Sequence, residues 1–315
     1  MQFIDHIETT WVEGQTVLTI GVFDGVHRGH QTLMRQVIES AQRSGRRSGV
    51  VTFHPHPASV LAPEHPIRYL STAAEKASLF AQMGVDVMAL IPFTPELAQQ
   101  PAEQFVEMIV DHLHPAEIWV GQDFALGRNR EGDIESLSAL GERYGFRVHR
   151  LDRVMWDGQV VSSSRIRGLL ATGEMERVAD LLGRQYSVTG QVVTGHRRGR
   201  RLGFPTANVD VPSERAVPRD GIYACYAVLN GERLPAASNL GVRPTFDETD
   251  RLLEVYLIDR DVDLYAQRLT VEFVHFLRQE QKFDSSEQLI AQMSADVDAT
   301  RRVLAASRQF ELHLG

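Results

Sequence analysis

The sequence predicts two domains of different classes, an α/β domain followed by a small antiparallel β-barrel or sandwich that ends in a helix. From Thr16 to about Leu182, short β-branched or apolar runs alternate with longer segments of helical period, which indicates an α/β domain. After Gly183 the pattern changes to short strands with close-set turns, which is typical of small antiparallel folds. We therefore expect one domain over residues 1–183 and a second over residues 184–315.

The first domain is expected to contain a mostly parallel sheet with helices between its strands. Ser71 or Thr72 can cap one helix, and Pro101 suits the first position of another. Strands joined by helical crossovers lie parallel, and ligands bind beyond their carboxyl ends. The expected strands are Val17–Val22, Gly49–Phe53, Val85–Ile91, Glu117–Val120 and Arg147–Leu151, and the expected helices include Gln31–Ser44, Ala73–Met83 and Ala102–Leu113.

The second domain is expected to be built from short antiparallel strands. Asn230-Gly231 lies between two of them and is a strong hairpin signal. In the last helix, Leu289, Met293 and Val297 recur at four-residue spacing, which predicts an apolar face that docks against the domain. The expected strands are Tyr186–Val193, Gly221–Leu229, Leu234–Leu240, Leu252–Ile258 and Leu269–Leu277, and the expected helix is Ser286–Ser307.

Composition and charge restrict the class of function. The 315 residues carry a formal net charge of −8, which argues against a broad nucleic-acid surface. No apolar run approaches the roughly 20 residues needed to span a bilayer, and the N-terminal stretch lacks signal-peptide features, so we expect a cytoplasmic protein without a membrane partner. The single cysteine, Cys225, cannot form an internal disulfide and is expected in the core.

A segment rich in glycine and histidine follows the first expected strand. Residues 21–30, Gly-Val-Phe-Asp-Gly-Val-His-Arg-Gly-His, turn and enter a helix, whose free amides and dipole favour an anion. Gly25 and Gly29 allow close approach of a phosphate, and His27 and His30 share a face from which both imidazoles can donate to its oxygens. Two ordinary surface histidines or a metal site are the alternatives, although no carboxylate or cysteine stands at ligand spacing.

The whole pattern Gly-x-Phe-Asp-x-x-His-x-Gly-His after a strand resembles the phosphate-binding motif of the nucleotidylyltransferase superfamily. A second segment, Ser162-Ser-Ser-Arg-Ile-Arg167, opens a helix with hydroxyls able to cap it and two arginines in its first turn. Alone it is weak, but at this distance downstream it resembles the second ATP-binding motif of the same superfamily. The resemblance implies that ATP is bound by Gly21, Phe23, Asp24, Gly25, Gly29, Ser162, Ser163, Ser164 and Arg167, with His27, His30 and Arg165 acting on the transferred phosphate.

A basic, glycine-containing loop in the second domain precedes the segment Pro205-Thr-Ala-Asn208. Thr206 and Asn208 project to the same side of an extended chain and offer neutral hard oxygens. Magnesium is commonly bound by few protein ligands, with substrate phosphates and water completing its coordination. The arrangement suits an ATP–magnesium complex covered by the loop, although Pro-Thr-Ala-Asn alone would favour the simpler interpretation, a turn followed by an edge strand.

Ordered blocks in both halves extend the resemblance to nearly the whole chain, from Val17 to Thr300. The chain resembles the bacterial bifunctional riboflavin kinase and FAD synthetase family. The matching blocks are Thr52-Phe-His-Pro-His-Pro57, Gly121-Gln-Asp-Phe124, Ser162–Arg167, Leu182-Gly-Arg184, Gly203-Phe-Pro-Thr-Ala-Asn208, Asn239-Leu-Gly-Val-Arg-Pro-Thr245, Leu253-Glu-Val-Tyr256 and Leu277-Arg-Gln-Glu280 with Lys282-Phe283.

The resemblance implies a Rossmann-like nucleotidylyltransferase domain that joins FMN to the AMP part of ATP, forming FAD and releasing pyrophosphate. It also implies a split-barrel riboflavin kinase domain, in which Thr206 and Asn208 hold Mg²⁺ and Glu254 is the general base for the ribityl 5′-hydroxyl. Without the motif, a glutamate on the polar face of a strand would simply be solvated. Further implied contacts are those of Gly195, Arg198 and Gly203 with ATP and of His56, Asp123 and Arg278 with the flavin.

Three positions, Val22, His54 and Ser164, depart from the commonest family pattern. Ser164 keeps a hydroxyl and Val22 sits at a strand end, so the expected phosphate contacts remain. His54 forms a His-x-His pair with His56, for which a structural or FMN-contacting role is favoured over a metal site. Two other hypotheses stay open: an N-terminal adenylyltransferase with a flavin-binding or regulatory barrel, and a non-catalytic binder of flavin or RNA that uses Arg197–Arg201.

Overall fold

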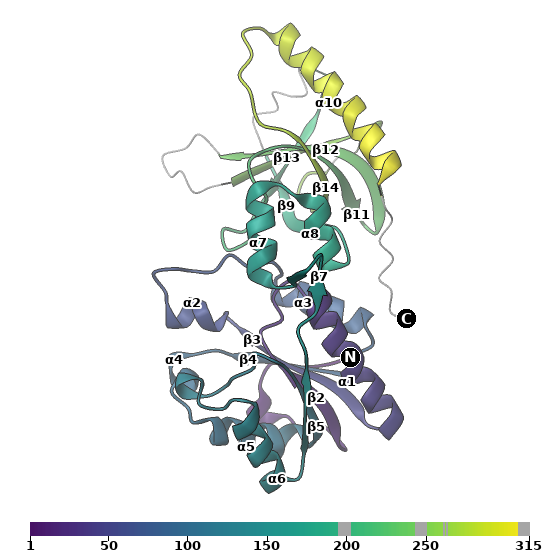
Figure 1. The fold of residues 1–315 in the computed structure, drawn as a ribbon. Coiled ribbons are helices and arrows are strands. Elements are labelled where there is room, and N and C mark those ends of the chain that lie inside the picture. Colours follow the sequence, from purple (N-terminus) through teal and green to yellow (C-terminus); the bar gives the residue numbers. More distant parts are fainter. Residues whose placement is uncertain (195–202, 243–250, 261, 263, 308–315) are drawn as a thin grey trace. The chain divides into compact units, whose positions relative to one another are not determined.

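The computed structural model describes residues 1–194, 203–242, 251–260, 262 and 264–307. The chain divides into two units, the first ending at Ser163 and the second beginning at Ser164. Figure 1 shows a sheet flanked by helices in the first unit and a barrel in the second. Within the described residues, no helix is long and apolar enough to cross a membrane.

Helices α7 (Ser163–Thr172) and α8 (Met175–Leu182) group almost entirely with the barrel. Helix α8 packs against the barrel strands β9 (Tyr186–Val193) and β14 (Arg268–Arg278), which explains this grouping. The division between the compact units therefore falls before α7. The functional boundary expected at Gly183–Arg184 stays a prediction.

The first unit is built on one parallel sheet. Its elements are β1 (Gln2–Ile4), η1 (Ile7–Thr9), β2 (Thr16–Ile20), α1 (Arg28–Ser44), β3 (Arg47–His54), α2 (Pro57–Leu61), α3 (Ala73–Gln82), β4 (Val87–Pro92), α4 (Pro95–Ala98), α5 (Ala102–Leu113), β5 (Pro115–Gly121), η2 (Arg128–Arg130), α6 (Ile134–Tyr144) and β6 (Arg147–Leu151), followed by the short hairpin of β7 (Met155–Trp156) and β8 (Gln159–Val160). The expected α/β class is confirmed, and all five expected strands are present. The edge strand β1, which pairs with β4, was not predicted.

The strand order β1-β4-β3-β2-β5-β6 places a switch point in the middle of the sheet. From β2 the chain runs outward to β3 and β4 on one side, and later to β5 and β6 on the other. The carboxyl ends of β2 and β5 therefore flank the position at which parallel α/β sheets bind their ligands. The segment of residues 21–30 follows β2, so the fold places it at this position.

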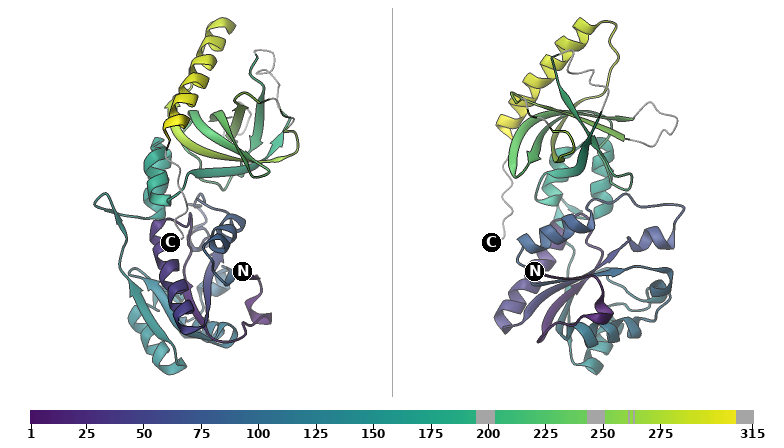
Figure 2. Two further views of the ribbon diagram at one scale, coloured as in Figure 1. Left: turned by 90° about the vertical axis from the view of Figure 1, so that its right-hand side faces the viewer. Right: turned by 180° about the vertical axis from the view of Figure 1, so that it is seen from behind.

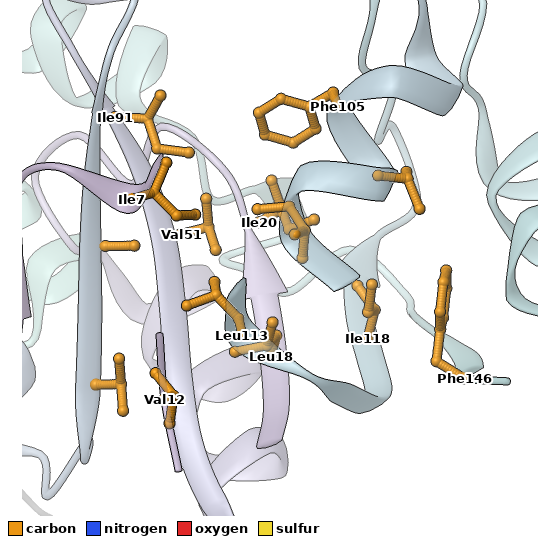
Figure 3. Close-up of a cluster of buried hydrophobic side chains, with 14 of the residues drawn as sticks. Ile7, Val12, Leu18, Ile20, Val51, Ile91, Phe105, Leu113, Ile118 and Phe146 are labelled. Atoms are coloured by element: carbon orange, nitrogen blue, oxygen red, sulfur yellow. The ribbon is translucent and has the colours of Figure 1, made fainter. Parts of the chain in front are cut away.

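Successive residues of each central strand face opposite sides of the sheet, and each side has its own helices. Val17 and Val50 pack toward α1 and α3. Leu18 and Val51, their neighbours in the chain, pack toward α5, and Figure 3 shows them in one cluster with Phe105 of that helix. Because both faces are buried, the strands are apolar along their whole length, and the sheet becomes a rigid platform for the loops at its edge.

The helix termini follow the expected capping chemistry with one exception. Thr72 and Glu75 form a reciprocal capping box at the start of α3. Helix α5 spans Ala102–Leu113, as expected, but Pro101 is its extended N-cap and not its first helical residue. The Ala102 N–H, which has no acceptor within the helix, donates to the Glu131 carboxylate at 3.0 Å.

The second unit is a closed six-stranded antiparallel barrel, which confirms the prediction for this half. Its remaining strands are β10 (Thr206–Asp210), β11 (Gly221–Leu229), β12 (Glu232–Val242) and β13 (Arg251–Leu257), and the order is β10-β13-β12-β11-β14-β9. The β11–β12 hairpin turns at Asn230-Gly231, with φ of 50° and 85°. Strand β10 is not an edge strand, because it pairs with both β9 and β13. Cys225 lies in the barrel core, as expected.

Helix α10 (Ser286–Ala306) lies against the barrel wall formed by β11, β12 and β14, as the views in Figure 2 show. Val297 of the predicted apolar stripe is buried, whereas Leu289 and Met293 are only partly buried. Arg278 of β14 donates two hydrogen bonds to Asp296 of the helix, at 2.9 and 2.7 Å. The apolar contact therefore lies further toward the end of the helix than expected, at Val297 and Leu304, and a bidentate ion pair adds to it.

Candidate active sites

The segment of residues 21–30 forms a strained turn at the carboxyl end of β2. The Val22 carbonyl accepts the hydroxyl hydrogen of Thr52 at 3.0 Å, which ties the turn to β3. Phe23 and Val26 have positive φ values of 52° and 41°, which residues other than glycine rarely adopt. Both side chains are buried in the core beneath α1, so their packing holds the backbone in this conformation.

His27 and His30 stack on each other at the start of α1. Their ring centroids are 3.6 Å apart and their planes differ by 17°. His27 is the N-cap residue, and its Nδ1 accepts the backbone N–H of His30, so the proton of the neutral ring lies on Nε2. Phe23 packs edge-on against His30 at 5.1 Å. The two imidazoles share a face, as expected, and each is oriented by a contact that the sequence did not reveal.

Because Gly29 has no side chain, the His27 ring can lie close to its backbone. A Cβ atom at position 29 would lie 3.1 Å from Cε1 and 3.2 Å from Nδ1 of His27. A side chain at this position would therefore displace the ring from its place over the helix terminus. The close approach of a phosphate to Gly29 stays a prediction.

The buried carboxylate of Asp24 anchors the turn to the loop that precedes α3. It accepts the backbone N–H groups of Leu70 and Ser71 at 3.0 to 3.1 Å. The Ser71 hydroxyl in turn accepts the N–H of Gly25 at 2.8 Å, and Gly25 has a φ of 79°, which favours glycine. These groups hold the turn in place, and direct contacts of Asp24 and Gly25 with ATP stay predictions.

The segment Ser162–Arg167 leads into α7. The Ser163 hydroxyl donates to the backbone carbonyl of Asp24 at 2.9 Å, so the structure brings the two predicted ATP motifs into contact at this point. Arg165 lies in the first turn of α7, as expected, whereas Arg167, the fifth residue of the helix, begins the second turn. The phosphate contacts of this segment stay predictions.

Lys76 of α3 lies beneath the same turn and was not predicted from the sequence. Only 4% of the residue is exposed. Its ammonium group donates to the carbonyl oxygens of Val22 and Phe53 at 3.1 and 3.4 Å and to the Thr52 hydroxyl at 3.3 Å. Burial lowers the pKa of Lys76 to about 8, although the negative charge of Asp24 opposes this change.

The two residues of the first unit that were expected to contact the flavin make local contacts. His56 is the N-cap of α2, where its Nδ1 accepts the N–H of Ala58 at 3.0 Å. Asp123 follows β5, on the other side of the switch point from residues 21–30. A hydrogen bond from Arg153 at 2.9 Å lowers the pKa of the Asp123 carboxyl. Flavin contacts of His56 and Asp123 stay predictions.

In the barrel, Asn208, Glu254 and Asn239 form a row across three neighbouring strands. Glu254 of β13 is paired on one side with Asn208 of β10 and on the other with Asn239 of β12. Directly opposed residues in antiparallel strands point to the same face, and Thr206 shares that face because it stands two residues from Asn208. The alternate residue Val255 is buried in the barrel core, so the polar row lies on the outer face. The structure thus brings the predicted general base and the predicted metal ligands together.

Asn239 is a residue of this row that was not predicted as part of the site. Its Oδ1 atom is buried and has no hydrogen-bond partner within the part of the chain that the structure describes. Leaving a buried acceptor without a donor costs about 1–3 kcal/mol, so an oxygen in this condition beside Glu254 suits a donor from a ligand. The signal in the sequence was Ser238-Asn239, two successive polar residues in the otherwise apolar stretch of residues 234–242.

The remaining predicted site residues of the second domain are Arg278, Gly203, Gly195 and Arg198. Arg278 uses its guanidinium group to hold Asp296 of α10, and its contact with the flavin stays a prediction. Gly203 has a φ of 86°, a conformation that favours glycine, shortly before β10. Gly195 and Arg198 lie outside the described residues.

The donors on the outer face of the barrel fit a magnesium ion that is shared with nucleotide phosphates. Thr206 and Asn208 offer neutral oxygens, and Glu254 offers a carboxylate beside them. Magnesium usually takes few protein ligands and completes its octahedron with phosphate oxygens and water. Among the described residues, no group of three or more His, Cys, Asp or Glu side chains could hold a metal ion. The binding of magnesium by these donors stays a prediction.

A histidine turn at the switch point of a parallel sheet and a polar row on a separate barrel are two candidate phosphate-binding sites, an arrangement that suits a transferase with two activities. Two family models match the chain, that of FAD synthetase over residues 10–165 and that of riboflavin kinase over residues 182–304. The chain belongs to the family of bifunctional riboflavin kinase/FMN adenylyltransferases.

Relatives of known name match the chain over nearly its full length. The bifunctional riboflavin kinase/FMN adenylyltransferase of Pseudomonas fluorescens is 40% identical over 293 residues, which cover 92% of this chain and 94% of that protein. The Listeria monocytogenes protein of the same name is 34% identical over 307 residues, covering 96% of this chain and 98% of that protein. A solved structure described as a macrolide-efflux protein from Streptococcus pneumoniae has a TM-score of 0.87 at 29% identity and covers 95% of this chain and 98% of that one.

Proposed function

We propose that this chain converts riboflavin to FAD in two ATP-dependent steps, the first at the barrel and the second at the parallel sheet. The observation that supports the proposal is the presence, in one chain, of two separate groups of residues suited to binding phosphate. One is the stacked pair His27 and His30, and the other is the row of Asn208 and Glu254. The boundary between the two activities is proposed at Gly183–Arg184, and the reactions need no nucleic-acid or membrane partner.

In the kinase step, Glu254 takes the proton from the ribityl 5′-hydroxyl of riboflavin. The oxygen then attacks the γ-phosphorus of ATP, the bond to the β-phosphate oxygen breaks, and FMN and ADP result. Thr206 and Asn208 would hold Mg²⁺, which supplies neutralisation of the phosphate charge. Because Asn208 and Glu254 are paired residues of adjacent strands, the barrel fixes the distance between the base and the metal ligands.

In the adenylyltransferase step, a phosphate oxygen of FMN attacks the α-phosphorus of a second ATP in line. The bond to the pyrophosphate oxygen breaks, and FAD and pyrophosphate leave without a covalent enzyme intermediate. Nε2 of His27 and the His30 imidazole donate to the α-phosphate oxygens as charge develops there. Arg165 and Arg167 bind the pyrophosphate part, because guanidinium forks match phosphate oxygens.

Chromatographic analysis of flavins for three proteins tests this assignment. With riboflavin, ATP and magnesium, the wild-type protein is expected to yield FMN and then FAD. His30→Ala should accumulate FMN, whereas Asn208→Ala should form no FMN but still convert supplied FMN to FAD. If Asn208→Ala leaves FMN formation unchanged, the barrel is not the kinase. If both activities fall together in each variant, the division of labour between the two sites is wrong.

A further inference from the structure

Lys76 stands out as a lysine in a chain that otherwise uses arginine. Of the 33 lysines and arginines, only Lys76 and Lys282 are lysines. Lys76 is also the buried one of the two, since Lys282 is exposed. A buried ammonium group is unfavourable unless specific acceptors compensate for its lost hydration, so the contacts of Lys76 must account for a lysine in the core.

The surroundings of Lys76 match the three donors of an ammonium group. The acceptors are the Val22 carbonyl, the Thr52 hydroxyl and the Phe53 carbonyl, at 3.1, 3.3 and 3.4 Å. The first of these belongs to the segment after β2, and the other two belong to β3. An arginine would bring a planar group with five donors, which this set of three acceptors does not match. Lys76 therefore joins α3 to the carboxyl ends of two neighbouring strands.

The contacts of Lys76 lead directly to the histidine pair. Val22 immediately precedes Phe23, which holds a positive φ and packs edge-on against His30. A shift of the Val22 carbonyl would therefore move the ring on which the His30 imidazole rests. In the transfer of a phosphoryl-type group, misplacement of a positioned donor by about 1 Å can cost on the order of a hundredfold in rate.

We propose that Lys76 is a positioning residue for the adenylyltransferase step, acting through Val22 and Phe23 on the orientation of His30. The inference rests on the proposed function of the first unit and deepens it. Lys76 does not contact the nucleotide; its ammonium fixes the turn that carries the donors. The kinase reaction at the barrel does not depend on this contact, so the kinase activity of the same protein serves as the internal control for its adenylyltransferase activity.

The test uses Lys76→Met in the full chain, with Ala74→Met, an exposed position of the same helix, as the matched control. The unbranched methionine fills the space without a charge, so the fold should persist. For FMN adenylylation by Lys76→Met we expect kcat to fall about tenfold or more, while KM for ATP changes by less than about threefold. Kinase activity should be unchanged in both variants. A folded Lys76→Met with wild-type kcat, or with a parallel loss of both activities, would overturn the inference.

An independent readout comes from lysine-selective ¹⁵N labelling, because the chain has only two lysines. We expect one slowly exchanging ammonium signal that is absent in Lys76→Met, present in Ala74→Met, and shifted when α,β-methylene-ATP is added. A signal that does not respond to the nucleotide would contradict coupling between Lys76 and the turn. Failure of the wild-type protein to make FAD from FMN would instead refute the proposed function, so the two failures are distinguishable.

Discussion

The replacement Asp24→Ala tests how the phosphate-binding turn is anchored. The carboxylate accepts the N–H groups of Leu70 and Ser71 in a buried environment. Its removal leaves both donors without their acceptor, and each buried donor in that condition costs about 1–3 kcal/mol. We therefore expect the first unit to lose about 2–6 kcal/mol of stability. Asp24→Asn can keep the Oδ1 atom that accepts both N–H groups but places an NH₂ group against the Leu70 N–H in place of Oδ2, so its loss should be intermediate.

Native-state hydrogen exchange measures this loss of stability separately in the first unit and in the barrel. The amides of β2 and β3 report the opening free energy of the first unit, and those of β11 and β12 serve as the reference because they lie in the barrel. For Asp24→Ala we expect faster exchange in the sheet, unchanged exchange in the barrel, and a loss of adenylyltransferase but not kinase activity. A loss below about 0.5 kcal/mol, the range of ordinary surface substitutions, would refute the anchoring role of Asp24.

Three further predictions follow from single contacts. Gly29→Ala should lower the rate of FMN adenylylation by up to about tenfold, because its Cβ would lie 3.1 Å from the His27 ring and the ring must shift by a few tenths of an ångström. The helix itself gains up to about 1 kcal/mol from alanine, and a wild-type kcat would contradict the prediction. Asn239→Leu should lower kcat for riboflavin phosphorylation by about tenfold and leave adenylylation of supplied FMN intact, because only the barrel site loses a polar group. An equal loss of the kinase and adenylyltransferase activities would argue against a role of Asn239 in the kinase site. Burial lowers the pKa of Lys76 from 10.5 to about 8, so between these pH values the unfolded chain binds more protons than the folded chain. Urea titrations should therefore show the stability of the wild type rising relative to that of Lys76→Met by about 3 kcal/mol from pH 8 to 10.5. A stability difference that stays constant with pH would refute the pKa shift.

The sequence predicted the elements whose pattern is local. Alternation of apolar runs identified the central strands, and Asn230-Gly231 identified the β11–β12 hairpin, because that turn requires residues that accept positive φ. Strand β1 was missed because three residues at a sheet edge carry too little periodicity. The range of α5 was predicted correctly, and only the position of Pro101, which is the N-cap and not the first helical residue, differs.

At the predicted sites too, the sequence revealed local features but not long-range contacts. The stacking of His27 and His30 follows from their spacing, and the proximity of Asn208 and Glu254 follows only from the barrel register. Lys76 could not be found from its neighbours in sequence, because its three acceptors come from segments more than 20 residues away. Long-range contacts of this kind set the geometry of a site, whereas short motifs identify the residues that carry the chemistry.

The most direct test of two ATP-dependent transfers by one chain is to trace two different phosphates of ATP. The wild-type protein is incubated with riboflavin, magnesium and ATP labelled in separate experiments at the α- and γ-phosphorus. The account predicts the γ-label in both FMN and FAD and the α-label in FAD alone, with one of each label per FAD molecule. Absence of the α-label from FAD, or of the γ-label from FMN, would contradict the central claim.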